Sequence, residues 1–438
     1  MWLCIFFEIT AMRFFFGTFA VLLSAFQVAF AQNIDYDQFF TDACLRIDYE
    51  MVGRRDTEFV VLKGLMEQGQ WAGTKTISGQ PAQLGNYRFS LIDSLSGRLI
   101  YSNGFSGLFN EWQQSPEALI KTASFYHVNL APMPRRTVLF RLERSNYSMP
   151  GHSTIAEFYI NPKSKFIRRE SAKPLKYTVV QGGDDVNGKI DIAFLAEGYT
   201  AEQMDKFRAD VSRFWNYMSG VEPYSSHKER FNVYAVESPS EESGTDIPNR
   251  GIFRNTAMNF TFSTFDIDRY LTSFDLKSIH DIAAVVPYDH IIIIVNTAEY
   301  GGGGFYNFYS SCVADHDLSQ RVLVHEFGHA FAGLADEYYY ADEANEEMYS
   351  LKREPWEPNL TTLVDFDSKW KPMLDAQTPV PTPRTKEYLG KIGVFEGGGY
   401  QTKGIYSPFQ DCIMRSNTPK TFCPVCRKAI LKAMGVEE

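Results

Sequence analysis

The segment Gln320–Phe331 places two histidines and a glutamate at a spacing that fits one turn of a helix. Its apolar residues recur at helical spacing and Ser319 precedes it as a candidate N-cap, so we expect a helix here. Side chains four positions apart lie on one face of a helix, which brings His325 and His329 together. Two imidazoles in this arrangement can bind one Zn²⁺ and leave Glu326 beside the open position as a base. The alternative is that these polar groups are merely satisfied inside a core.

A catalytic zinc needs a third protein ligand, and this need constrains the chain after the helix. On a continued helix Asp336 would face the same way as His325, but it would lie about 16 Å further along the axis. The helix must therefore end and the chain must turn back. Gly333 stands where a residue of left-handed conformation would end the helix. We predict Asp336 as the third ligand, with the neighbouring Glu337 and the more remote Glu396 as alternatives.

This arrangement resembles the metzincin pattern of zinc peptidases, in which a glycine turn separates the histidine pair from a third His or Asp ligand. Here the glycine and the acidic residue each come one position later than in that pattern. Asp411–Arg415 resembles the Met-turn of the same clan, which implies that Met414 lies under the metal. With Leu334–Tyr338 and Gly404–Pro408 included, the chain is similar over most of its length to the M64 peptidases, the IgA peptidase family. The resemblance implies a β-rich N-terminal domain before a zinc peptidase domain.

The predicted activity is hydrolysis of peptide bonds in extracellular proteins or glycoproteins by water that zinc activates. The family name adds immunoglobulin, or a mucosal glycoprotein, as a possible substrate, although that activity belongs to some members only. Glu326 would take the proton of the water and later deliver it to the leaving amine. Residues 301–309, rich in glycine, are predicted to form an edge strand that pairs with an extended substrate, and Tyr338 or a nearby tyrosine to stabilise the oxyanion. The alternative is a non-catalytic surface protein that binds a glycan or a host protein, with a residual or structural zinc site.

The hydrophobic pattern changes near Pro174, which predicts two domains. In residues 33–172 apolar and polar positions alternate within short segments, as in an antiparallel β-sandwich, at 58–62, 87–91, 137–141 and 156–160. Residues 175–438 are predicted to form an α/β domain of metzincin-like type. Its expected strands lie at 189–195, 231–236 and 290–295, and its expected helices at 202–218, 265–274 and 276–284.

Residues 1–31 have the pattern of a secretory signal peptide. An apolar run, Phe14–Phe30, follows Arg13, and Ala29-Phe30-Ala31 fits cleavage after Ala31. We therefore expect a secreted, periplasmic or cell-surface protein, with an uncleaved N-terminal anchor as the alternative. No later stretch reaches the ~20 apolar residues of a membrane span, so no stable membrane insertion is expected after cleavage. The formal charge is -10, from 43 Lys and Arg against 53 Asp and Glu, which argues against a nucleic-acid partner.

The cysteines that follow the signal segment are odd in number: Cys44, Cys312, Cys412, Cys423 and Cys426. The Cys423–Cys426 spacing could be half of a zinc ribbon, but the second pair that would complete it is missing. In an exported protein we predict one or two disulfides within Cys412, Cys423 and Cys426, with Cys312 as a further candidate and free buried thiols as the alternative. Residues 315–317 carry two aspartates and a histidine, which we interpret as the polar start of the next helix rather than as a second metal site.

Overall fold

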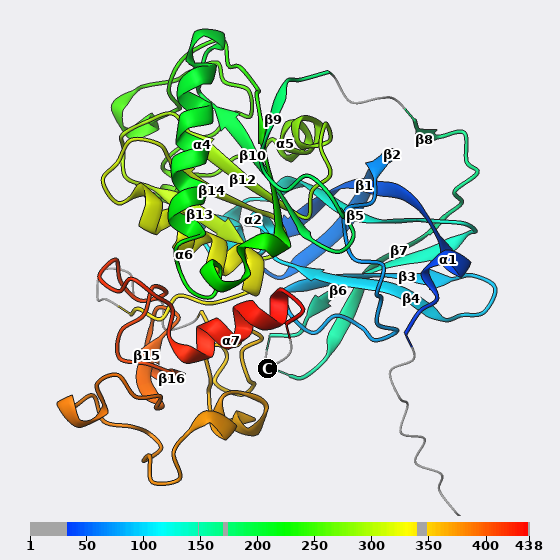
Figure 1. Ribbon diagram of the computed structural model, residues 1–438. Helices are drawn as coiled ribbons and strands as arrows, with labels where there is room; N and C mark the ends of the chain where they lie inside the picture. Colours follow the sequence, from blue (N-terminus) through cyan, green and yellow to red (C-terminus); the bar gives the residue numbers. More distant parts are fainter. Residues whose placement is uncertain (1–32, 148, 170–173, 340–347, 437–438) are drawn as a thin grey trace, which may run out of the picture.

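The computed structural model describes residues 33–147, 149–169, 174–339 and 348–436 (Figure 1). The predicted signal peptide, residues 1–31, lies outside the described residues. Within the described ranges, no helix combines the length and the apolar character that a bilayer span requires.

Two four-stranded sheets make up the N-terminal region. The first has the order β5-β1-β2-β8 and consists of β1 (Phe40–Arg54), β2 (Thr57–Gln70), β5 (Ala123–Pro134) and β8 (Ile167–Arg168). The second has the order β4-β3-β6-β7 and consists of β3 (Tyr87–Asp93), β4 (Leu99–Phe105), β6 (Val138–Ser145) and β7 (His152–Ile160). Neighbouring strands are antiparallel except for β2 and β8, which are parallel. Short helices α1 (Tyr36–Phe39), α2 (Leu108–Trp112) and α3 (Glu117–Ile120) accompany them.

The predicted β-rich N-terminal region is thus confirmed, and its four predicted segments fall on β2, β3, β6 and β7. Burial alternates along β6 at period two, as the sequence pattern indicated. Aromatic contacts join the two sheets: the rings of Tyr49 and Phe140 lie 6.4 Å apart, and those of Phe40 and Tyr101 lie 6.5 Å apart. Because these side chains are buried, the two sheets share one hydrophobic core.

A mixed six-stranded sheet of order β13-β14-β12-β10-β11-β9 forms the centre of the C-terminal region. Its strands are β9 (Tyr177–Gln181), β10 (Ile190–Glu197), β11 (Phe231–Val236), β12 (His290–Val295), β13 (Gly302–Phe305) and β14 (Tyr309–Val313). The four inner strands are parallel, and the two edge strands run antiparallel to their neighbours. The predicted strands at 189–195, 231–236 and 290–295 correspond to β10, β11 and β12.

The two faces of this sheet are covered by different parts of the chain. Ile292 and Ile294 of β12 pack in one core with α4 (Met204–Met218), α6 (Ser319–Ala332) and α7 (Pro424–Ala433). Ile291 and Ile293 pack in the other core, with α5 (Leu276–Ala283) and the N-terminal region. In Figure 1, α4 and α6 accordingly lie on one side of the sheet and the N-terminal strands lie on the other. Continuous apolar runs in β10 and β12 therefore reflect burial on both faces.

Two local predictions were wrong. Residues 265–274 form no helix: a 3-10 turn at Thr264–Asp266 is followed by a bridge from Thr261 to Thr272. Positive φ values of 60°, 56° and 64° at Ser263, Phe265 and Asp266 are incompatible with a right-handed helix. Ser319 is the first residue of α6 and not its N-cap, because Leu318 occupies that position. By contrast, Thr200 acts as a cap as predicted: it forms a capping box with Gln203 at a 3-10 turn, Ala201–Gln203, which leads directly into α4.

The segment between α6 and α7 is largely irregular. It contains 3-10 turns at Phe366–Ser368, Lys371–Met373 and Lys386–Tyr388 and one antiparallel hairpin, β15 (Phe395–Gly398) and β16 (Gln401–Ser407). Figure 1 places this hairpin and α7 on the same side of the molecule. The amides of Gly399 and Tyr400 donate to the carbonyls of Asp336 and Tyr338, which follow α6 closely in the chain. The irregular segment therefore borders the end of α6, where the chain must turn.

Candidate metal centre

Helix α6 carries His325, Glu326 and His329 beside the glycine-rich edge of the sheet. An ideal Cβ on Gly304 of β13 would lie 2.3 Å from the carbonyl oxygen of Glu326, and one on Gly302 would lie 3.1 Å from Glu326 Oε1. Side chains larger than hydrogen would therefore push the helix away from the strand. The glycines of β13 let α6 approach closely, and this approach sets the distance of the two histidines from the edge of the sheet.

Both imidazoles are held through their Nδ1 atoms. Nδ1 of His325 lies 2.9 Å from the carbonyl oxygen of Ile413, and Nδ1 of His329 contacts the carbonyl oxygen of Leu334. A carbonyl can only accept a hydrogen bond, so each Nδ1 carries the proton and each Nε2 carries a lone pair. The two Nε2 atoms point toward one another and lie 3.1 Å apart.

The chain turns back after α6 as the sequence predicted. Gly333 adopts the left-handed conformation at φ 63° and ψ 30°, and its amide donates to the carbonyl of His329 at 3.0 Å. The amide of Leu334 donates to the carbonyl of Gly328 at 3.3 Å. This turn brings Oδ1 of Asp336 to 3.0 Å from Nε2 of His325 and 3.3 Å from Nε2 of His329.

These three atoms form a set of donors that fits a divalent metal ion. All three are electron-pair donors, and Asp336 Oδ1 is buried without a hydrogen-bond partner. Metal bonds of about 2.0–2.1 Å in a tetrahedral site separate two ligand atoms by about 3.3 Å, close to the spacing of these three. Imidazole and carboxylate are ligands that a borderline metal accepts. The residues present therefore match a centre of three protein ligands with one position left open.

Glu326 lies beside this triangle and does not complete it. Its carboxylate is within 4.8 Å of the ligand nitrogens of both histidines. Burial raises the pKa of the Glu326 carboxyl above its ordinary value, and the charges of His325 and His329 oppose part of that rise. A carboxylate with a raised pKa next to a centre of this kind is suited to accept and return a proton.

Comparison with protein families identifies the chain. A family model described as IgA Peptidase M64 matches residues 178–392 and 384–434, and a second, described as Peptidase M64 N-terminus, matches residues 35–154. The chain belongs to the M64 peptidase family. A comparison with curated proteins found no match. M64 peptidases are metallopeptidases, and the predicted membership of the M64 family is confirmed.

In this M64 family member, the two alternatives to Asp336 do not reach the histidines. Glu337 Oε1 faces the other way and lies 3.2 Å from Cys426 Sγ and 3.1 Å from Asn359 Nδ2. Glu396 is exposed on β15 and accepts from the amide of Gly404 at 3.2 Å. The geometry therefore brings Asp336, and neither Glu337 nor Glu396, to the histidine pair.

Two residues that support the centre, Tyr400 and Asn359, were missed from the sequence. The hydroxyl of Tyr400 donates to Asp336 Oδ2, and Tyr338 Oη lies 3.3 Å from Tyr400 Oη. Asn359 accepts from the amide of Ala335 at 2.7 Å and donates to its carbonyl at 2.8 Å. Both come from the irregular segment more than twenty residues after the helix, where no periodicity links them to Asp336. The carbonyl of Ile413 could be expected only through the Met-turn resemblance.

Met414 lies under α6. It is fully buried, and an ideal Cβ on Gly328 would lie 2.9 Å from its Sδ atom. Its carbonyl accepts from the amide of Glu337 at 2.7 Å, which joins the Met414 segment to the segment that carries Asp336. The glycine between the two histidines therefore leaves the space that the methionine fills.

The N-terminal region of this M64 peptidase reaches the neighbourhood of the centre. Glu111 of α2 accepts a hydrogen bond from the hydroxyl of Tyr270, and its charge interacts with His329, Asp336 and Glu326. Burial raises the pKa of Glu111 to about 7. The amide of Ser106 donates to the carbonyl of Tyr306 at 2.9 Å, next to β13. The N-terminal region, for which no chemistry was predicted, thus places a buried acidic side chain whose charge interacts with the centre.

The remaining polar candidates have other contacts. Asp315 pairs with Lys206 at 3.0 Å, and Nδ1 of His316 accepts from the amide of Leu318 at 3.2 Å, so this segment precedes α6 without forming a metal cluster. The five cysteines of the described residues are free and buried, so the predicted disulfides are absent. Cys412 Sγ and Cys426 Sγ lie 3.9 Å apart, well beyond the ~2.05 Å of an S–S bond.

Proposed function

We propose that this M64 peptidase is an exported, zinc-dependent endopeptidase that hydrolyses peptide bonds of extracellular proteins or glycoproteins. The single observation that carries the proposal is the triangle of His325 Nε2, His329 Nε2 and Asp336 Oδ1, with Glu326 beside it. A structural zinc site is closed by four protein ligands and has no use for a neighbouring base. Three converging ligands and one unattached carboxylate instead suit catalysis.

In this proposal His325, His329 and Asp336 hold Zn²⁺, which when bound polarises a peptide carbonyl and makes water more acidic. The carbonyl oxygens of Ile413 and Leu334 keep both imidazoles in the tautomer that presents Nε2. The hydroxyl of Tyr400 holds the carboxylate of Asp336 from the far side.

Glu326 acts as the proton carrier. Its carboxylate takes a proton from the attacking water and passes it to the nitrogen of the leaving amine, so the base becomes the acid in the second half of the reaction. Burial keeps the pKa of Glu326 raised, which favours a group that must hold a proton between the two transfers. Tyr338, whose hydroxyl lies 3.3 Å from that of Tyr400, stays our candidate for contact with the oxyanion.

The substrate would lie along β13. This strand pairs with β14 on one side and is at the end of the sheet, with a bridge from Gly302 to Tyr270 on its outer side. An extended peptide can join such an edge by main-chain hydrogen bonds. The backbone groups of Gly304, which face the same side of the strand as those of Gly302, would align the substrate next to Glu326.

The finer description of the molecule belongs to the same proposal. We assign residues 1–31 to a signal peptide, 33–172 to an N-terminal β-sandwich and 175–438 to a metzincin-like catalytic domain with Met414 as its Met-turn residue. The matches at 35–154 and 178–434 support a boundary between the two described parts. Export to the periplasm, the cell surface or the medium follows from the signal sequence.

The experiment compares cleavage of casein and immunoglobulin by the purified protein and by its Glu326→Ala variant, with zinc content measured in both. We expect cleavage only by the wild type, loss of cleavage with a chelator, and recovery with added zinc. Glu396→Ala, which removes an exposed carboxylate of β15, is the matched control and should cleave as the wild type does. Bound zinc without Glu326-dependent cleavage of any protein would favour a surface binding protein. Incubation with a mixed secreted proteome, followed by sequencing of new N-termini, identifies the substrate class.

A further inference from the structure

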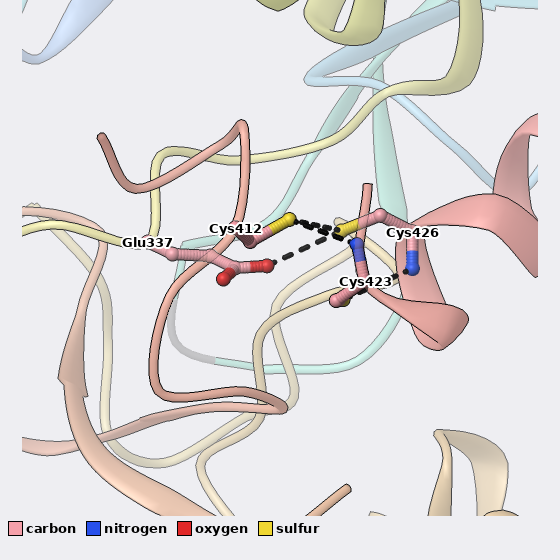
Figure 2. A group of neighbouring side chains, drawn as sticks. All are labelled: Glu337, Cys412, Cys423 and Cys426. Atoms are coloured by element: carbon pink, nitrogen blue, oxygen red, sulfur yellow. Dashed lines mark hydrogen bonds between the residues drawn. The ribbon is translucent and has the colours of Figure 1, made fainter. Parts of the chain in front are cut away.

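A second group of side chains of the types that bind metal ions lies outside the proposed catalytic centre. Figure 2 shows Glu337, Cys412, Cys423 and Cys426 converging from three separate segments of the chain. Their ligand atoms all lie within 4.8 Å of one another, and the four residues are 0–3% exposed. None of them contacts the proposed ligands of the first centre through its side chain.

The spacing of these atoms matches a tetrahedral metal site. Cys412 Sγ and Cys426 Sγ are 3.9 Å apart, and Glu337 Oε1 is 3.2 Å from Cys426 Sγ. Zinc–sulfur bonds of about 2.3 Å and zinc–oxygen bonds of about 2.0 Å place such ligands about 3.8 Å and about 3.5 Å apart. The observed distances therefore require little movement to enclose an ion.

The backbone around the cysteines is arranged for thiolates. The amide of Cys423 donates to Cys412 Sγ at 3.2 Å, and the amide of Cys426 donates to Cys423 Sγ at 3.5 Å. Cys423 is the N-cap of α7, a helix of ten residues whose first turn favours negative charge. Arg415, which donates to the carbonyl of Glu337, brings a positive charge to the same place.

Glu337 is an independent sign that a cation belongs here. Its side chain is fully buried and its Oε2 atom has no hydrogen-bond partner, because the guanidinium of Arg415 donates to the backbone carbonyl of Glu337 and not to its carboxylate. Burying an unpaired carboxylate is costly unless the group is paired or coordinates a metal. The side chains that face it are Asn359 and Cys426, and neither carries a positive charge.

We propose that Glu337, Cys412, Cys423 and Cys426 bind a second Zn²⁺ in a closed structural site. The half-ribbon pair Cys423–Cys426 is completed by Cys412 and by a carboxylate in place of a second cysteine pair. When the ion binds, the three thiols release their protons to solvent and four protein atoms fill the coordination sphere. No position remains for water, so this site takes no part in hydrolysis.

The site would connect the parts that shape the catalytic centre. Glu337 follows Asp336 directly, and Cys412 precedes Ile413, whose carbonyl holds His325. Cys423 and Cys426 begin α7, which packs in the same core as α6. An ion at this place therefore fixes the third ligand and the Met414 segment relative to the zinc helix.

The test measures zinc per chain by mass spectrometry of the metal in the purified full-length protein. We expect two zinc ions per chain in the wild type and one in the His325→Ala/His329→Ala variant. The remaining ion should exchange for Co²⁺ with a sulfur-to-cobalt charge-transfer band in the near ultraviolet. Because this variant lacks the proposed catalytic ligands, its zinc reports on the cysteine site alone, whether or not the protein is a peptidase.

Cys423→Ala should lose one zinc ion and the charge-transfer band. Cys312→Ala removes an equally buried thiol of β14 outside the cluster and should keep both ions. If Cys423→Ala does not fold, the wild type and the histidine variant still decide the matter. A histidine variant without metal, cobalt bound without sulfur ligation, or a disulfide between any two of Cys412, Cys423 and Cys426 in the wild type would overturn the proposal.

Discussion

Asp336 and Glu337 are consecutive residues whose carboxylates enter two different clusters. Asp336 Oδ1 lies 3.0 Å from His325 Nε2, whereas Glu337 Oε1 lies 3.2 Å from Cys426 Sγ. The amide of Glu337, which belongs to the peptide unit joining the two residues, donates to the carbonyl of Met414. The sharp turn at Gly333 thus delivers one acidic side chain to each side of the chain.

Substitution of these two neighbours should separate the two clusters. Asp336→Ala removes one of three ligands, and we expect it to lose the zinc of the histidine centre and at least about 10²-fold of the activity, since an outer-shell change alone costs 10–100-fold. Glu337→Ala should keep the histidine zinc, lose the zinc of the cysteine site and lower the thermal midpoint of unfolding. Zinc content, cleavage rate and thermal unfolding are measured on both variants. Equal losses of activity in the two variants would contradict the separation.

Tyr400→Phe removes the hydroxyl that donates to Asp336 Oδ2 while keeping the ring. Outer-shell partners orient a ligand and typically contribute 10–100-fold to metal affinity. We expect the dissociation constant for zinc to rise by about that factor, measured by competition with a chelator of known affinity. Tyr159→Phe, on β7 with 69% of its side chain exposed, is the control and should leave the affinity unchanged. An unchanged affinity in Tyr400→Phe would show that Asp336 needs no such support.

Gly333→Ala tests the turn that ends α6. Alanine at this position would have to adopt φ 63°, and its Cβ would lie 2.8 Å from the ring of Trp356. The left-handed conformation alone costs about 1–2 kcal/mol for a residue with a Cβ, so the free energy of unfolding should fall by at least that amount. Gly64→Ala on β2, where a Cβ would meet no atom within 4 Å, is the control. Urea denaturation measures the stability of both variants. Equal midpoints for the two would show that the turn at Gly333 does not require glycine.

His127 should make the protein less stable in acid. Its ring is stacked on Phe308 at 4.8 Å and lies 4.4 Å from Phe105, its Nε2 atom has no hydrogen-bond partner, and burial lowers its pKa to about 3. In the unfolded chain the pKa is about 6.5. Below pH 6.5 the unfolded state therefore binds a proton at His127 that the folded state does not bind. The free energy of unfolding consequently falls as the pH falls from about 6.5 toward 3.

The measurement is urea denaturation of wild type and His127→Phe at pH 7.5 and at pH 5. The wild type should lose about 2 kcal/mol more than the variant between these values, because 1.5 pH units below the unfolded pKa correspond to that energy. All other titrating groups are shared by the two proteins and cancel in the comparison. Identical losses in both proteins would mean that His127 is protonated in the folded state.

The parts of the site that were predictable are those set by local spacing. His325, Glu326 and His329 follow from helical periodicity, and the turn at Gly333 follows from the distance that a straight helix would impose on Asp336. Helix α4 was expected because the capping box of Thr200 and Gln203, at the 3-10 turn that leads into it, is local. The absence of a helix at 265–274 was not, because the positive φ values there are imposed by tertiary pairing with Thr261 rather than by composition.

The residues that could not be predicted are joined by contacts across long stretches of chain. Glu337 meets Cys426 89 positions later, and Tyr400 meets Asp336 across 64 positions. The cysteines were expected to pair because export permits disulfides, yet their Sγ atoms surround a buried carboxylate instead. Only the fold could reveal that Glu337 and Cys412 lie beside the half-ribbon pair Cys423 and Cys426.

The most direct test of the central claim is a crystal structure with an anomalous difference map at the zinc absorption edge. The account predicts a peak bonded to Nε2 of His325, Nε2 of His329 and Oδ1 of Asp336, with Glu326 next to a remaining position that no protein atom fills. A structure with no ion between these three atoms, or with a fourth protein ligand in the open position, would contradict it.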